Sequence, residues 1–317
     1  MIVIQPHQAC VNVVCFSPDG SRLASVSEDC YAKVWDPMEL HTGQPLWEVD
    51  AEADHDDDEL WWWSGTGLSH AQFTPNGQLL ITSGWSRHLR AWDVTTGRAK
   101  WEIRKPRGFG GVGVLVISRD GSRLAFAGGQ IGIPERVFIV DLNHPKLEKS
   151  VKGHDDACGA LAAGPEGFVS GGADKHVKLW SWQSGRCYCD LALRGVVRGL
   201  MVSPDGSRLA ASGGAVVMVW DMLEPQRKHG RRLPGKLRQF RGHNGQVQSI
   251  DFSPNGQLIA SAAHDGTIRL WDAASGAELR TFAPKIGPLH HVAFSPDGLT
   301  VAFSSERGHI GLLDLES

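Results

Sequence analysis

Short runs of alternating hydrophobic and polar residues fill this chain, and a recurring five-residue phrase punctuates them. Runs such as 22–25, 32–36 and 279–282 intersperse apolar and polar residues, and in 32–36 Ala32 and Val34 alternate with Lys33. A period of two is typical of a β-strand with two unlike faces. One such run precedes each phrase, and three follow it in every repeat but the last. The pattern therefore predicts four strands per repeat.

The phrase consists of an apolar residue, then Ser, Thr or Gly, then Pro or Arg, an acid or amide, and Gly. Proline sets φ for the first corner of a type I turn, and glycine takes the following left-handed position at little cost. Such a turn joins antiparallel strands. The seven glycines are Gly20, Gly77, Gly121, Gly167, Gly206, Gly256 and Gly298. Their mean spacing of about 46 residues is typical of one small sheet per repeat.

Composition agrees with a turn-rich β protein. The 317 residues include 38 Gly and 16 Pro, 41% are hydrophobic, and no long uncharged run offers a membrane span. We expect residues 1–317 to form one domain, and the first residues lack the pattern of a secretory leader. The six cysteines show no zinc-ligand spacing. They indicate reduced thiols, and we expect a cytoplasmic protein without cofactor or metal.

The ends of the repeats carry a family resemblance. Trp-Asp pairs stand at 35–36, 92–93, 220–221 and 271–272, and Gly-His pairs at 153–154 and 242–243. With seven phrases in register, the chain resembles the WD40-repeat family over its whole length. The resemblance implies an all-β fold, a seven-bladed β-propeller of four-stranded antiparallel blades around a central channel.

Spacing also predicts how the ring closes. In four repeats an apolar residue ends the outer strand 11 residues after the third-strand Trp or the residue that replaces it, as Ile103 and Phe282 do. The last repeat has no such residue before Ser317. Ile4 lies 14 residues before Pro18, which is the phase of an outer-strand residue in other repeats. We therefore expect residues 1–5 to pair with the C-terminal blade and to cover its edge.

Three repeats contain Ser, His and Asp at similar spacing, a combination that also occurs in hydrolases. A catalytic triad is built around one nucleophile, whereas these residues recur at equivalent positions, so we expect a structural role and no catalytic residue. The family resemblance implies a hydrogen-bonded chain from His to Trp that locks the blade. The sets are His7, Ser25, Asp29, Trp35; His154, Ser170, Asp174, Trp180; and His243, Ser261, Asp265, Trp271. Repeats without a full set are expected to be looser, such as repeat two with Thr82 and Ser86 and repeat five with Ala211.

Two insertions carry opposite charge and nearly cancel in the net charge of −3. Residues 50–59 hold seven acids and no Lys or Arg, and residues 227–241 hold seven bases and no acid. The first connects blades one and two, and the second interrupts the last turn of blade five. Alternating strand direction therefore predicts that they lie on opposite faces of the ring.

The acidic insertion leads directly into three tryptophans, and the second turn of blade two adds another on the same face. Aromatic anchors beside charge are typical of interface hot spots. The candidate partner-binding residues are Asp56, Asp57, Asp58, Glu59, Trp61, Trp62, Trp63 and Trp85. The alternative is that some of these indoles pack inward, as strand alternation would direct them.

These features favour a non-enzymatic scaffold that binds a protein or peptide segment, with a basic segment favoured, on the face of the between-blade loops. Membership of a larger complex fits the same interpretation. Two alternatives stay open. One is weak polyanion or nucleic-acid binding by the basic insertion through Arg227, Lys228, Arg231 and Arg232. The other is an enzyme with an unrecognised site in the channel.

Overall fold

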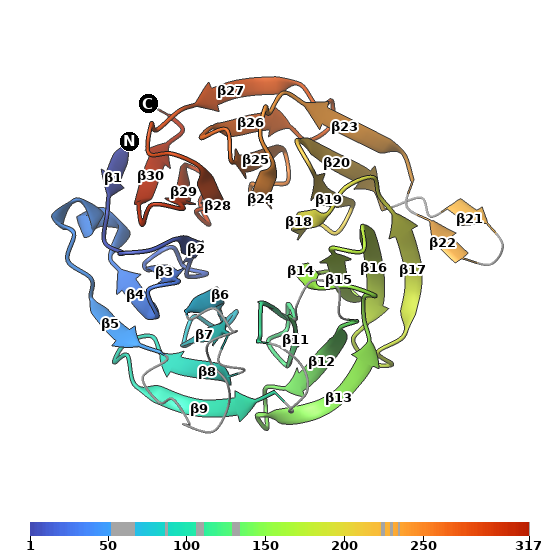
Figure 1. Ribbon diagram of the computed structural model, residues 1–317, viewed down its shortest axis with the longest axis horizontal. Helices are drawn as coiled ribbons and strands as arrows, with labels where there is room; N and C mark the ends of the chain where they lie inside the picture. Colours follow the sequence, from blue (N-terminus) through green and yellow to red (C-terminus); the bar gives the residue numbers. More distant parts are fainter. Residues whose placement is uncertain are drawn as a thin grey trace.

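The computed structural model describes residues 1–51, 67–85, 88–105, 111–128, 134–222, 226–228, 231–233 and 235–316. For residues 226–228 and 231–233 it describes the backbone only. Within these ranges, seven four-stranded antiparallel sheets stand in a ring around a common centre (Figure 1). The predicted seven-bladed β-propeller is confirmed.

The first three blades follow one another along the chain. Blade one comprises β2 (Val11–Phe16), β3 (Leu23–Ser27), β4 (Tyr31–Trp35) and β5 (Trp47–Asp50), with the 3₁₀ helix η1 (Pro37–Thr42) between β4 and β5. Blade two comprises β6 (Leu68–Phe73), β7 (Leu79–Gly84), β8 (His88–Asp93) and β9 (Ala99–Arg104). Blade three comprises β10 (Val114–Ile117), β11 (Arg123–Ala127), β12 (Arg136–Asp141) and β13 (Lys146–Lys152).

The last four blades complete the ring. Blade four comprises β14 (Cys158–Ala163), β15 (Gly167–Gly172), β16 (His176–Ser181) and β17 (Cys187–Ala192). Blade five comprises β18 (Val197–Val202), β19 (Arg208–Gly213), β20 (Val216–Asp221) and β23 (Leu237–Arg241). Blade six comprises β24 (Val247–Phe252), β25 (Leu258–Ala263), β26 (Ile268–Asp272) and β27 (Glu278–Phe282). Blade seven comprises β28 (Leu289–Phe294), β29 (Thr300–Ser305), β30 (Ile310–Asp314) and β1 (Ile2–Ile4).

The ring closes between its first and last strands. Antiparallel pairing of β1 with β30 places Ile2 opposite Leu312 and Ile4 opposite Ile310. The two chain ends consequently lie near each other at the same blade (Figure 1). This pairing confirms the closure predicted from the phase of Ile4.

The recurring phrase forms the first turn of the blades. In blade one, the Gly20 N–H donates to the Ser17 carbonyl at 2.9 Å, and the Ser17 hydroxyl donates to the Asp19 carboxylate at 2.5 Å. Gly20 has φ of 74°, and five of the other phrase glycines are also left-handed. The fourth turn differs from the expectation. Gly167 begins β15 with no positive φ, and a Cβ there would overlap the Trp180 carbonyl.

Neighbouring first turns contact one another around the ring. A Cβ added at Gly77 would meet the Pro18 ring at 3.8 Å, and at Gly298 it would meet the Pro254 ring at 3.3 Å. The third phrase has Arg119 in place of proline. Its guanidinium passes blade four and donates to the Ser203 and Pro204 carbonyls of blade five, at 2.9 and 2.6 Å.

The two faces of the ring differ in their loops. The connection face carries the between-blade connections and the turns that join second and third strands; the turn face carries the other turns. The acidic insertion leaves β5 on the connection face, but Asp56 to Glu59 and Trp61 to Trp63 lie outside the described residues. On the turn face, β21 (Gln226–Lys228) and β22 (Arg231–Leu233) pair as a hairpin that projects from the periphery (Figure 1).

The described residues contain neither a membrane-length apolar helix nor a group of three or more acidic, His or Cys side chains arranged to hold a metal ion. All six cysteines lie in this part of the chain, and none forms a disulfide. Cys10, Cys15 and Cys158 have thiol pKa values raised to about 12, in each case mainly by burial. These thiols are protonated at neutral pH and poor nucleophiles.

Candidate functional site

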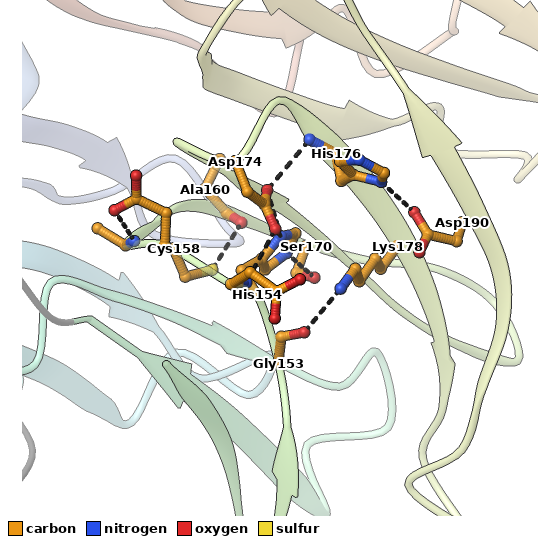
Figure 2. A network of polar contacts seen from close by, with 12 residues as sticks. Gly153, His154, Cys158, Ala160, Ser170, Asp174, His176, Lys178 and Asp190 are labelled. Atoms are coloured by element: carbon orange, nitrogen blue, oxygen red, sulfur yellow. Dashed lines mark hydrogen bonds and ion pairs between the residues drawn. The ribbon is translucent and has the colours of Figure 1, made fainter. Parts of the chain in front are cut away.

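Each Ser, His, Asp and Trp set forms one hydrogen-bonded chain. In blade four, the Trp180 indole donates to Ser170 Oγ at 2.8 Å, and His154 Nε2 lies 2.7 Å from the same oxygen. His154 Nδ1 lies 2.9 Å from Asp174 Oδ1, as Figure 2 shows. Blades one and six repeat these contacts with distances of 2.8 to 3.1 Å.

The burial of these sets indicates a structural role rather than a catalytic one. Ser25, Ser170 and Ser261 are fully buried, so their hydroxyls cannot meet a substrate. Burial lowers the pKa of His154 and His243, although the neighbouring aspartate opposes the shift in each case. The imidazoles of His154 and His243 are therefore neutral at pH 7, and each bridges Ser to Asp.

The aspartate of each set also holds the backbone of the connection face. Asp265 accepts hydrogen bonds from the Asn244 and Thr267 N–H groups at 2.9 and 3.0 Å. Burial alone would raise its pKa, but hydrogen bonds from Thr267, Asn244 and His243 outweigh it and lower the pKa to about 2. Because the folded pKa is depressed, this stabilisation is complete above about pH 4 and is lost as the pH falls toward 2.

Replacing Asp265 by asparagine is expected to lower the free energy of unfolding by about 1–3 kcal/mol, because buried partners lose a charged acceptor. Urea unfolding at neutral pH measures the loss, and the acid limb of stability should become shallower. The matched control is Asp297→Asn, since asparagine already occupies the equivalent turn position at Asn76 and Asn255. Equal losses in the two variants would show that the set adds nothing.

Blade two keeps part of the chain, since the Trp92 indole donates to Thr82 Oγ1 at 2.9 Å. Ser86, at the aspartate position, lies outside the described residues. In blade five, Ala211 pairs with Leu200 in the sheet at the serine position. Blade three departs furthest, because Phe126 takes the serine position and stacks on Phe138 with ring centroids 5.1 Å apart.

A buried ion pair accompanies the phenylalanine stack of blade three. Lys105 Nζ lies 2.8 Å from Glu135 Oε1, and the two residues are only 1% and 2% exposed. Lys105 also donates to the Gly111 carbonyl at 3.2 Å and lies 5.4 Å from the Phe138 ring centroid. Sequence reasoning missed this pair, because neither residue matches a repeat motif. The one sequence signal for the pair was the position of Lys105 directly after β9, because His154 holds nearly the same position after β13.

The innermost strands carry several buried ionisable side chains, among them Asp251, whose pKa burial raises to about 7. Burial lowers the pKa of His70 to about 4 and that of His291 to about 3. His290 Nδ1 lies 3.2 Å from the Asn12 carbonyl of the next blade, and burial lowers its pKa as well. These imidazoles are neutral at pH 7.

The turns between second and third strands form a ring on the connection face. Their first residues are Glu28, Trp85, Gly128, Ala173, Gly214, His264 and Glu306. Five of these residues donate their backbone N–H to a carbonyl of the preceding connection, as the Trp85 N–H does to Gly67 at 3.2 Å. The seven positions are therefore structurally equivalent, and their side chains can be compared directly.

Acidic and aromatic side chains of this ring lie together on one side. Trp85 is 36% exposed, whereas every complete-set tryptophan is at most 3% exposed. Burial and the charge of Glu306 raise the pKa of Glu28, so these two acids are close enough to repel. His264 Nε2 lies 2.9 Å from Glu306 Oε1. The connection-face arc is defined as Trp85, Glu28, Glu306 and His264, opposite the small residues of blades three to five.

The structure thus places one predicted partner-binding residue, Trp85, and supplies two acids that sequence reasoning did not select. The other predicted members of that site lie outside the described residues. For Arg227, Lys228, Arg231 and Arg232 the structure describes the hairpin backbone only. Polyanion binding by these residues stays a prediction.

Comparison with known proteins identifies the repeats. The model of the family described as WD domain, G-beta repeat matches residues 1–36, 63–93, 145–181 and 235–272. The chain is 25% identical over 272 residues to the transcriptional corepressor LEUNIG_HOMOLOG of Arabidopsis thaliana, covering 84% of this chain and 30% of that protein. It is 26% identical over 322 residues to the small ribosomal subunit protein RACK1y of Oryza sativa subsp. japonica, covering 85% and 94%.

A third relative is the nuclear distribution protein nudF 1 of Talaromyces marneffei, 25% identical over 303 residues, with 85% of this chain and 59% of that protein covered. Four matched segments, the degenerate repeats between them and the closed ring agree with one another. The chain thus contains WD40 repeats in these four segments and folds as a seven-bladed β-propeller.

Proposed function

We propose that this propeller is a non-enzymatic scaffold that binds a basic protein or peptide segment across its connection face. WD40 propellers generally serve as protein-interaction scaffolds, and relatives of this chain include a ribosomal subunit protein and a transcriptional corepressor by name. The observation that carries the proposal is the partly exposed Trp85 in the same arc of the connection face as two mutually repelling acids, Glu28 and Glu306.

The arc matches a basic ligand in two ways. A lysine or arginine between Glu28 and Glu306 would relieve the repulsion that raises the pKa of Glu28. The Trp85 indole offers a large, rigid contact surface, and tryptophan is enriched among residues whose truncation costs most of the binding energy. The acids of residues 50–59, which the sequence predicts on the same face, would steer a basic segment toward the ring.

Trp85→Ala is expected to weaken capture of the partner by an amount worth about 2 kcal/mol, chiefly through faster dissociation, without changing the melting temperature. Affinity purification with quantitative mass spectrometry identifies the partner, and surface plasmon resonance measures both rates. Glu28→Gln with Glu306→Gln should instead lower the association rate and its salt dependence.

Met38→Ala is the matched control, because Met38 is 84% exposed on the turn face. It should leave partner capture unchanged. Loss of stability together with undiminished capture in Trp85→Ala would show that the indole is a packing residue. Capture lost equally in Met38→Ala would place the interface elsewhere.

A further inference from the structure

Outer strands seal the groove to the next blade at three edges of the ring. The Trp47 indole of β5 donates to the Val94 carbonyl in the last turn of blade two at 2.7 Å. Lys149 Nζ of β13 donates to the Gln183 carbonyl at 2.7 Å, and the Arg280 guanidinium of β27 donates to the Leu315 carbonyl at 3.0 Å. Trp47, Lys149 and Arg280 occupy equivalent positions. Each pairs in its sheet with the third-strand residue just before Trp35, Val140 or Trp271.

Trp101 of β9 holds the same position in blade two, opposite Ala91. The equivalent acceptor in blade three is the Leu142 carbonyl, because Leu142 and Val94 both follow the aspartate that ends the third strand. Within the described residues, neither the Trp101 indole N–H nor the Leu142 carbonyl has a hydrogen-bond partner. Trp47 and Trp101 are therefore a matched pair, one sealed against the next blade and one open.

The last turn of blade three explains the difference. In blade two, Gly97 is left-handed, its N–H donates to the Asp93 carbonyl at 2.8 Å, and the Trp47 ring lies against it. The blade-three turn has the same length, but Pro145 stands at the glycine position. Proline has no N–H to donate and cannot take a positive φ. The blade-three turn therefore cannot reproduce the glycine turn against which the Trp47 ring packs.

A cleft of about 490 Å³ lies at this edge on the turn face, between the first turns of blades two and three and the last turn of blade three. Trp101, Leu79 and Leu142 form its apolar part and continue the core between the two blades. Its lining residues are Thr74, Pro75, Asn76, Leu79, Trp101, Asp120, Gly121, Leu142 and Asn143.

Charge is one-sided in this cleft, since Asp120 is its one charged lining residue. Hydrogen bonds from Ser118 and Ser122 lower the pKa of Asp120 to about 2, so the carboxylate is ionised throughout the physiological range. The cleft therefore combines an apolar wall, a free indole donor, a free carbonyl acceptor and one exposed negative charge.

We propose that the cleft is a second peptide-docking surface, which takes an aliphatic or proline side chain against Trp101 and Leu142 with a lysine or arginine beside it facing Asp120. The Trp101 indole donates to a carbonyl of the bound peptide, and the Leu142 carbonyl accepts from a peptide N–H. This surface lies on the face opposite Trp85, so its test is independent of the connection-face arc.

Panning a phage-displayed library of random dodecapeptides against the full chain tests the proposal, with affinities of the selected peptides measured by fluorescence anisotropy. Selected sequences should place an apolar residue next to Lys or Arg. Trp101→Ala should lower their affinity at least about tenfold. Asp120→Asn should lower it several-fold and flatten its salt dependence, while the turn stays intact as it does with Asn76 and Asn255.

Asp297→Asn is the matched control for charge, because it makes the same change in the first turn of blade seven. Leu279→Ala is the control for apolar surface, with Leu279 52% exposed on blade six. Both should bind the peptides as wild type does. Selection of no peptide, of peptides without a basic residue, or of peptides that bind wild type and Asp120→Asn equally would overturn the proposal, even if Trp101→Ala fails to fold.

Discussion

Replacing Lys105 by methionine is expected to lower the free energy of unfolding by about 3–5 kcal/mol, because the variant leaves Glu135 buried without its cation. Burial already raises the pKa of Glu135, and the contact with Lys105 opposes that shift. Without the lysine the pKa should rise further, so protonation neutralises the carboxylate as the pH falls. The stability difference from wild type should therefore shrink on acidification. Urea unfolding at neutral and mildly acidic pH measures both effects.

Two controls separate a buried unpaired charge from a general loss of contacts. Lys105→Met with Glu135→Leu removes both charges and should recover most of the stability. Lys33→Met breaks the Lys33–Glu48 pair, which has a similar separation of 2.7 Å but a half-exposed carboxylate, and should cost less than about 1 kcal/mol. A loss in Lys105→Met no larger than that in Lys33→Met would contradict the assigned burial.

Deleting residues 1–5 is expected to lower the free energy of unfolding by at least about 3 kcal/mol and to promote aggregation. The deletion removes the β1–β30 ladder and the packing of Ile2 and Ile4 against the core between blades seven and one. It also leaves β30 as an exposed edge with apolar side chains. Thermal melting and size-exclusion chromatography measure the two consequences.

Point variants keep this test independent of chain length. Val3→Pro removes a backbone donor in the middle of β1 and should reproduce much of the loss. Met1→Ala, at a residue 62% exposed, should melt like wild type. An unchanged melting curve for the deletion would mean that β1 adds nothing to closure.

Features that recur in every blade could be predicted from the sequence. Ile4 identified the closing strand because the interval between an outer strand and the next turn is fixed by the size of one blade. Gly167 was misread because a glycine can be required for two reasons. Six phrase glycines supply a left-handed turn, whereas Gly167 provides room for the Trp180 carbonyl.

Contacts peculiar to one blade were not predicted. Lys105 and Glu135 are 30 residues apart and belong to no repeated motif, so only the packing of blade three brings them together. The open cleft at Trp101 depends on the backbone N–H that Pro145 lacks. This signal is visible only when the last turns of blades two and three are aligned position by position. Trp85 was selected from the sequence because a turn with known direction fixes its face.

Arg119 changes how the ring distributes its stability. In a ring of repeats, each unit ordinarily contacts its two neighbours, and the total stability approximates a sum of nearest-neighbour terms. The two hydrogen bonds from Arg119 to blade five add a next-nearest coupling that bypasses blade four. If blade four opens locally, these hydrogen bonds still join blade three to blade five. Blade four can therefore unfold locally without breaking the ring open.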